Sequence, residues 1–211
     1  MCPLIIKNIP SPAMPVEQAL TASAPLPIPG QLAPRLTTTP LHQSAFAVLS
    51  VTIRDNRKRI VELAEEKSLE LDSDVCQKAR SDLTNPRTRL SAEIAWLPGV
   101  SPRKASQLVE SLLQNPMGVR QESGLPTLAH LNLLAAAFEA VDEDYDAVDL
   151  TSFIQDVAYL ADDLVPEDVL RDINEDRAVS GFPEVRALDQ IEAELAERMR
   201  YYRSAIKDAH I

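Results

Sequence analysis

The C-terminal part of the chain carries an apolar repeat that only an α-helix can place on one face. Between residues 185 and 206 the apolar positions advance by 3, 3, 4, 4, 3 and 4 residues, an average of 3.5. This spacing is that of a heptad seam and predicts a helix over 184–208. The seam either packs on the chain's own helices or pairs two copies of the chain in a homodimer. Its central residues are Leu188, Ile191, Leu195, Met199 and Tyr202.

The rest of the sequence also favours helices. Only 5 glycines and 4% aromatic residues occur in 211 residues, which leaves little of the turn chemistry that sandwiches and barrels need. We therefore predict an all-α fold. Apolar periodicity and capping residues predict further helices over about 43–50, 53–70, 73–84, 86–96, 102–113, 127–141, 150–164 and 166–177.

Proline divides the chain into a first segment and a helical remainder. Nine of the 16 prolines fall within residues 1–40, and proline lacks the N–H group that helices and sheets require. We predict a disordered or polyproline-like arm over 1–42, which is either a solvated linker or a docking ligand for an aromatic groove. Three parts follow: a helical module (43–97), a turn, helix and loop (98–125), and an acidic helical domain (126–211).

Charge is distributed unevenly along the chain. The net charge is −11; residues 1–125 contain 14 Lys and Arg against 12 Asp and Glu, and residues 126–211 contain 7 against 20. The second half should repel nucleic-acid phosphates, so such a partner would have to bind the first half.

No catalytic or metal-binding signature is evident. The two cysteines lack the spacing of a zinc site or a disulfide framework, and Cys76 is expected to be a buried thiol. The acidic stretch 142–150 lacks the glycine and the bidentate glutamate of a calcium loop. We expect no metal, no cofactor and no enzymatic activity. No apolar run is long enough to span a bilayer, and we expect a cytoplasmic protein that does not contact membranes.

Residues 44–96 resemble a J domain, the helical module that recruits heat-shock ATPase chaperones. "AFAVLSV" at 45–51 resembles the end of the first J-domain helix, with Ser50 in place of a glycine, and "IRDNRKRIVELAEE" at 53–66 resembles its basic second helix. "ARSDLTNPRTR" at 79–89 resembles the junction of the third and fourth helices. Its matching residues are Ala79, Leu83, Asn85, Pro86 and Arg89. We call residues 43–97 the J-like module.

The J-like module departs from the family at the element that triggers ATP hydrolysis. J domains carry a His-Pro-Asp tripeptide after the second helix, whereas the corresponding region here is "EEKSLELDSD" at 65–74. The resemblance therefore implies binding without the usual stimulation. A basic face would attract an acidic protein partner. The same charges also fit a solvated helix face on which they form ion pairs four residues apart, such as Lys58–Glu62. The candidate partner-binding residues are Arg54, Arg57, Lys58, Arg59, Arg87 and Arg89.

"WLPGVSPRKASQLVESL" at 96–112 resembles a helix-hairpin-helix turn, a DNA-binding motif. Such turns bind phosphate through backbone N–H groups at a helix N-terminus. Ser101 stands where the second glycine belongs. The candidate phosphate-binding residues are Gly99, Ser101, Arg103 and Lys104. A purely structural interpretation is also open, with Gly99 ending a helix and Ser101-Pro102 starting the next. Trp96 is expected to anchor the core at this point.

Together these patterns predict a non-catalytic adaptor or co-chaperone-like protein. Its partner is expected to be a protein, such as a chaperone-type ATPase or a larger complex. The alternative is a nucleic-acid-associated accessory protein that binds phosphate through the turn at 96–109.

Overall fold

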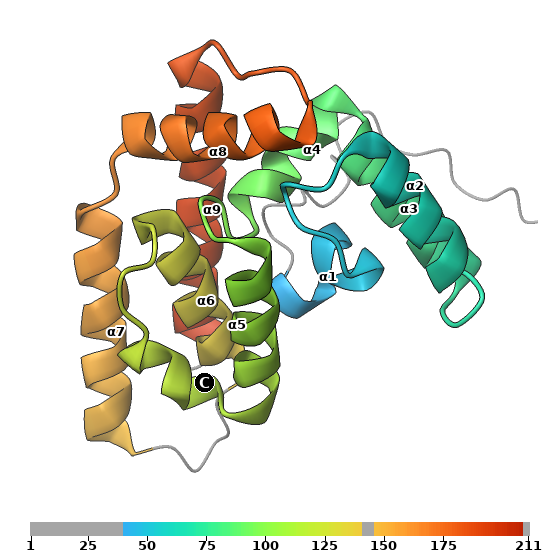
Figure 1. Cartoon of the computed structure of the whole chain (residues 1–211). Helices are drawn as coiled ribbons and strands as arrows, with labels where there is room; N and C mark the ends of the chain where they lie inside the picture. The colour runs from blue at the N-terminus through green and yellow to red at the C-terminus, as the bar shows by residue number, and fades with distance from the viewer. Residues whose placement is uncertain (1–39, 141–145, 209–211) are drawn as a thin grey trace, which may run out of the picture. The chain divides into compact units, whose positions relative to one another are not determined.

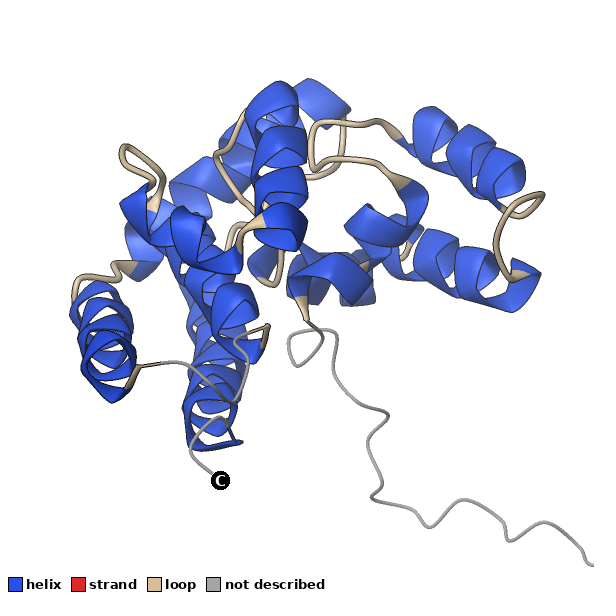
Figure 2. Cartoon of the chain, turned by 90° about the horizontal axis from the view of Figure 1, so that it is seen from below, coloured by secondary structure: helices blue, strands red, loops and turns tan. Residues whose placement is uncertain are grey.

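The structure, a computed structural model, describes residues 40–140 and 146–208. Within these ranges every regular element is a helix (Figures 1 and 2), which confirms the prediction of an all-α fold. The α-helices are α1 (Ala45–Leu49), α2 (Arg57–Lys67), α3 (Ser73–Thr84), α4 (Pro86–Ile94), α5 (Pro102–Gln114), α6 (Thr127–Glu139), α7 (Ala147–Asp162), α8 (Pro166–Ser180) and α9 (Leu188–Asp208), and two 3-10 helices are η2 (Leu41–Gln43) and η3 (Pro116–Gln121).

Side-chain caps set several of the helix starts. The Asn56 side chain accepts a hydrogen bond from the Arg59 N–H, and Asp72 caps α3 in the same way. The predicted helix over 53–70 therefore begins at Arg57, later than expected. Ahead of it, the backbone N–H and hydroxyl of Thr52 both donate to Asp55, at 2.7 and 3.0 Å, and hold a turn. Polar side chains that satisfy the backbone outside a helix compete with helix extension.

The folded part of the chain includes two residues that the sequence assigned to the N-terminal arm. Most of that arm, 1–39, lies outside the described residues. Leu41, however, is fully buried within η2, so residues 41 and 42 belong to the folded part of the chain. The apolar side chain at 41 explains this, because burying it stabilises the folded chain.

Helices α2 and α3 lie side by side as a hairpin, and α1 and α4 pack against α3. Figures 1 and 2 show the loop between α2 and α3 at the outer end of this hairpin, away from the other labelled helices. We call residues 68–75, this loop and the first turn of α3, the hairpin tip. It contains the stretch "SLELD" at 68–72.

One cluster of buried apolar side chains runs from α1 through α3, α5 and α6 to α7 and α9. It includes the stacked pair Phe46 and Trp96, whose ring centres are 5.5 Å apart, and the pair Phe138 and Phe153 at 5.0 Å. Trp96 is thus a core anchor as expected, and Cys76 is buried. The predicted boundary at residue 97 does not separate two hydrophobic cores.

The heptad seam of α9 packs on the chain's own helices. Ile191 and Leu195 are buried in a second apolar cluster formed with α4, α6 and α8, against which Leu188 also packs. Tyr202 is buried in the larger cluster, and Met199 packs against that cluster. The seam is therefore not an exposed dimer surface. The same heptad spacing fits a helix that packs on its own chain and a helix that pairs with a second copy, so the sequence could not distinguish the two.

Ser50 adopts a left-handed backbone conformation at the end of α1, with φ of 55°. A side chain in this region costs about 1 kcal/mol, and glycine does not incur this cost. We expect Ser50→Gly to raise the free energy of unfolding by about 0.5–1 kcal/mol, as measured by urea denaturation. The Ser50 side chain is exposed, so little packing is lost. An unchanged or lower stability would contradict this expectation.

Candidate functional site

Four of the six candidate partner-binding cations lie exposed near the N-termini of α2 and α4. They are Arg57, Lys58 and Arg59 in the first turn of α2, and Arg87 in the first turn of α4. The Arg57 guanidinium donates to the Thr84 carbonyl at the end of α3, which ties the start of α2 to the α3–α4 junction. We call these four residues the basic face.

The other two candidates are engaged elsewhere. Arg54 forms an ion pair of 2.7 Å with Asp176 of α8, whose side chain is buried. Arg89 is only 1% exposed and cannot contribute to a surface for a partner. In the sequence, Arg89 was a candidate for partner binding because a charged side chain is usually exposed. Its hydrogen bonds, described below, show how it is buried.

The charges of α2 are arranged against the helix dipole. The dipole favours carboxylates in the first turn and cations in the last, each by about 0.3–1 kcal/mol. In α2 the first turn holds three cations and no acid, and the last turn holds two acids, Glu65 and Glu66, beside one cation, Lys67. The first turn of α4 likewise lacks an acid and holds Arg87. Helix stability does not explain this arrangement.

The α3–α4 junction leaves main-chain carbonyls without their helical partners, because Pro86 has no N–H. Three side chains supply donors instead. The Thr88 hydroxyl donates to the Asp82 carbonyl at 2.8 Å, and Arg89 Nη1 donates to that of Leu83 at 2.9 Å. Arg57 donates to Thr84. The Asn-Pro-x-x-Arg motif is thus accounted for by the end of one helix and the start of the next.

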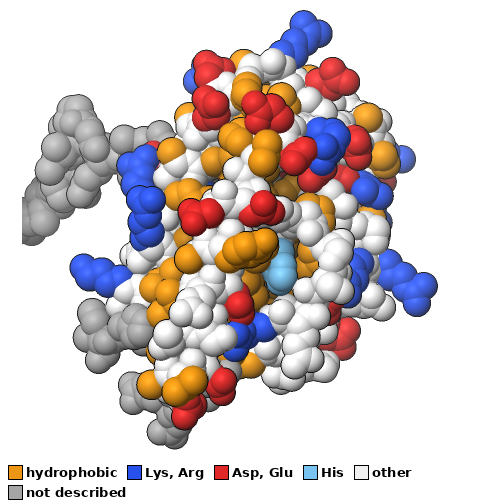
Figure 3. Space-filling model, turned by 90° about the vertical axis from the view of Figure 1, so that its left-hand side faces the viewer, with side chains coloured by type: hydrophobic (Ala, Val, Ile, Leu, Met, Phe, Trp, Pro, Cys, Tyr) orange, Lys and Arg blue, Asp and Glu red, His pale blue; other side chains and the backbone are white. Residues whose placement is uncertain are grey.

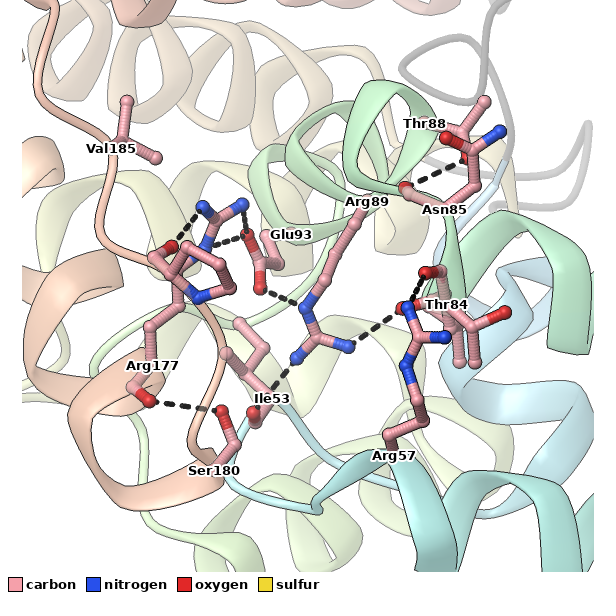
Figure 4. A network of polar contacts seen from close by, with 12 residues as sticks. Ile53, Arg57, Thr84, Asn85, Thr88, Arg89, Glu93, Arg177, Ser180 and Val185 are labelled. Carbon is pink, nitrogen blue, oxygen red and sulfur yellow. Dashed lines mark hydrogen bonds and ion pairs between the residues drawn. The ribbon is translucent and has the colours of Figure 1, made fainter.

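Arg89 also belongs to a buried network that joins α4 to α8 (Figure 4). Its Nε donates to Glu93 at 2.7 Å, and its Nη2 donates to the Ile53 carbonyl at 3.1 Å. Arg177 of α8 donates to the other Glu93 oxygen from Nε and Nη2, at 2.9 and 2.6 Å. One buried carboxylate therefore lies between two guanidinium groups. The Phe182 ring covers Arg89, with 3.4 Å from Cζ to the ring centre.

The two arginines and Glu93 carry a net charge of +1 in the interior. Burial lowers the pKa of Arg89; Glu93 opposes this shift, and Arg177 and Arg57 add to it. Main-chain carbonyls offset the excess charge, since Arg89 binds the negative end of α3 and Arg177 Nη1 donates to the Pro183 carbonyl at 2.8 Å. A cavity of about 330 Å³ lies beside the network. Three arginines line it, of which Arg186 is exposed. Arg89 and Arg177 are already bonded to Glu93 and to main-chain carbonyls, so the network itself serves to hold the helices together.

A second buried network is centred on Asn132 of α6. Its amide nitrogen donates to the carbonyls of Ile94 and Trp96, at 2.8 and 2.6 Å. Its oxygen accepts from Arg198 Nε and from the Tyr202 hydroxyl, both at 2.6 Å. One fully buried side chain thus connects the end of α4 to α9.

The candidate phosphate-binding turn is occupied by the protein itself. Gly99 has φ of +75°, and its N–H donates to Asp176 at 2.8 Å. A Cβ at Gly99 would lie 2.9 Å from Pro126 Cγ and 3.2 Å from Asp172 Cγ. An internal carboxylate therefore takes the position that a phosphate would need, which corrects the assignment of Gly99 to phosphate binding.

The remaining residues of the turn are divided between solvent and internal contacts. Ser101 is the N-cap residue of α5, but its side chain makes no capping hydrogen bond. Lys104 forms an ion pair of 2.6 Å with Glu122. Arg103 is exposed. The turn thus offers one exposed cation, Arg103, and its Gly99 N–H is already hydrogen-bonded to Asp176. A phosphate site requires more donors than this.

The sequence missed Glu93, Asn132, Asp176, Arg177 and Arg198, all of which are buried. Two of them have a signal that could have identified them. Glu93 is the one charged residue in "LSAEIAWL", and Asn132 is flanked by apolar residues in "LNLLAAAF". A charged or amide side chain within a mainly apolar run is buried with it and needs a partner. Their partners on α8 and α9 are too distant in sequence to predict.

Other surfaces are less distinctive. On the face where α7 lies, hydrophobic and acidic side chains are interspersed, and Lys and Arg side chains are scattered (Figure 3). Among the described side chains, no group of three His, Cys, Asp or Glu could hold a metal ion. Across the described residues, no helix has both the length and the apolar character needed to cross a membrane.

Comparisons with protein-family models, with curated proteins and with solved structures return no match for this chain.

Proposed function

We propose that this protein is a non-catalytic, co-chaperone-like adaptor that binds an acidic surface of a protein partner through the basic face. The observation that carries the proposal is the charge arrangement of α2 and α4. Cations at two helix N-termini oppose the helix dipoles and reduce the stability of these helices. We therefore assign them a role other than stabilising the fold. Exposed cations grouped in this way attract and orient an acidic partner.

The J-domain resemblance indicates the kind of partner. The α2–α3 hairpin, with α1 and α4 against α3, supports it. The tripeptide position holds "SLELD" at 68–72. We therefore expect binding to a chaperone-type ATPase or to a larger complex, without stimulation of ATP hydrolysis.

Charge reversal separates binding from stability. We expect Lys58→Glu/Arg59→Glu to weaken partner binding about tenfold or more and to change the melting temperature by less than about 4 °C. The new acids suit the helix dipole, and the ion pairs lost with Glu62, at 3.6 and 3.9 Å, are exposed and weak. Binding is measured with the partner captured from lysate after nuclease treatment, and stability by thermal denaturation.

A matched control reverses two other exposed arginines. Arg103→Glu/Arg203→Glu changes the net charge equally, on α5 and α9, and should leave protein binding unchanged. Equal losses in both double variants would contradict a specific basic face. Capture that disappears with nuclease and depends on Arg103 would instead support the nucleic-acid alternative.

The ATPase assay tests the co-chaperone part of the proposal. With a purified heat-shock ATPase chaperone, we expect the full chain to bind and to leave the rate of ATP hydrolysis within about twofold of the basal rate. Stimulation comparable to that given by a J domain with the tripeptide would contradict the expected role of "SLELD".

A further inference from the structure

The hairpin tip exposes apolar side chains that the fold does not use. Leu69 is 87% exposed and Val75 is 49% exposed. Leu71 precedes the N-cap Asp72, the position from which a hydrophobic staple stabilises a helix start. Neither Leu69 nor Val75 lies at a position that stabilises a helix start in this way. Exposed apolar side chains grouped on a protein surface indicate an interaction site.

Acidic side chains surround these residues. Residues 65–74 contain five acids, Glu65, Glu66, Glu70, Asp72 and Asp74, and one cation, Lys67. All five acids are exposed. Asp72 and Asp74 suit the N-terminus of α3, but Glu65 and Glu66 lie at the C-terminus of α2, where the helix dipole disfavours them. The tip therefore combines apolar side chains with an excess of negative charge at the opposite end of α2 from the basic face.

A cavity continues the apolar surface from the tip. It has a volume of about 150 Å³ and lies between α1, α3 and α4. Val75 lines its edge, and Ala45, Val48 and Ala79 form part of its wall. The ion-paired Lys78 and Asp82 also line it, with 2.6 Å between Nζ and Oδ2. The small side chains of the wall leave room for a side chain from outside.

We infer that the hairpin tip and this cavity form a second binding surface, which takes a basic, amphipathic peptide segment of a partner protein. A bulky apolar side chain of the segment enters the cavity and packs on Val75. Lys or Arg residues of the same segment face Glu70, Asp72 and Asp74. The charge of the tip repels nucleic-acid phosphates, so a protein segment is the occupant that complements it. This surface is independent of the basic face.

The test uses a library of random 12-residue peptides displayed on phage and selected on the full chain. We expect the enriched peptides to combine a bulky apolar residue with Lys or Arg. Synthetic copies should bind Val75→Asp and Leu69→Asp at least about tenfold more weakly than the parent. Leu69→Asp alters a loop side chain outside the core, so it keeps the test valid if Val75→Asp affects folding. Val148→Asp on α7 is the matched control, because Val148 is 77% exposed.

Each outcome decides the proposal. Selective loss in the two tip variants, with Val148→Asp unchanged, supports it. Acidic enriched peptides, an absence of enrichment, or equal binding by all variants overturns it. Peptide binding that persists in Lys58→Glu/Arg59→Glu separates this surface from the basic face, so failure of one proposal can be distinguished from failure of the other.

Discussion

Glu93→Ala is expected to lower the free energy of unfolding by about 3–5 kcal/mol, which is the cost of leaving buried charges without their partner. Glu93 is fully buried and accepts hydrogen bonds from both Arg89 and Arg177. Its removal leaves two buried guanidinium groups without the carboxylate that they share. For a chain of this length the melting temperature should fall by roughly 6–20 °C. Urea and thermal denaturation of the full chain measure both quantities.

Two further variants isolate the cause. Glu93→Gln retains the shape and one acceptor oxygen but removes the negative charge, and its loss of stability should lie between those of the parent and Glu93→Ala. Glu62→Ala removes a carboxylate whose ion pairs with Lys58 and Arg59 are exposed, and it should cost less than about 1 kcal/mol. A loss below 1 kcal/mol for Glu93→Ala would show that the network does not hold α4 to α8.

Asn132→Leu is the second substitution with a large expected effect. The apolar side chain fits an apolar environment, but it removes the partners of two carbonyls, one guanidinium N–H and one hydroxyl. An unsatisfied buried polar group costs about 1–3 kcal/mol, and relaxation will lessen the sum. We expect a loss of at least about 3 kcal/mol, measured by urea denaturation.

Tyr202→Phe is the matched control for Asn132→Leu. It removes one donor to the Asn132 oxygen and leaves the ring in place, so it should cost about 1 kcal/mol. If both substitutions cost the same, the Asn132 amide contributes little through the carbonyls of Ile94 and Trp96. In that case the connection between α4 and α6 would depend on apolar packing alone.

Local signals were sufficient to predict much of the secondary structure. Apolar periodicity predicted the helical class, and the Asn85-Pro86 pair predicted the start of α4. Helix ends were less accurate where side chains bind the backbone, as at Thr52 and Asp55 ahead of α2. These contacts are short in sequence range, but several competing hydrogen-bonding patterns fit the same residues.

The sequence by itself determined the helical fold class, the basic charge at the start of α2 and the acidic charge at the hairpin tip, because these depend on residue type and local spacing. Only the tertiary structure decided which charges are exposed. Arg89 and Arg59 look alike in sequence, yet Arg89 is buried because Glu93 and two main-chain carbonyls accept hydrogen bonds from it there. Likewise, the Gly99 N–H is not available to a phosphate because Asp176, 77 residues away, accepts its hydrogen bond. Such partners come together only when distant helices pack, and no local pattern encodes them.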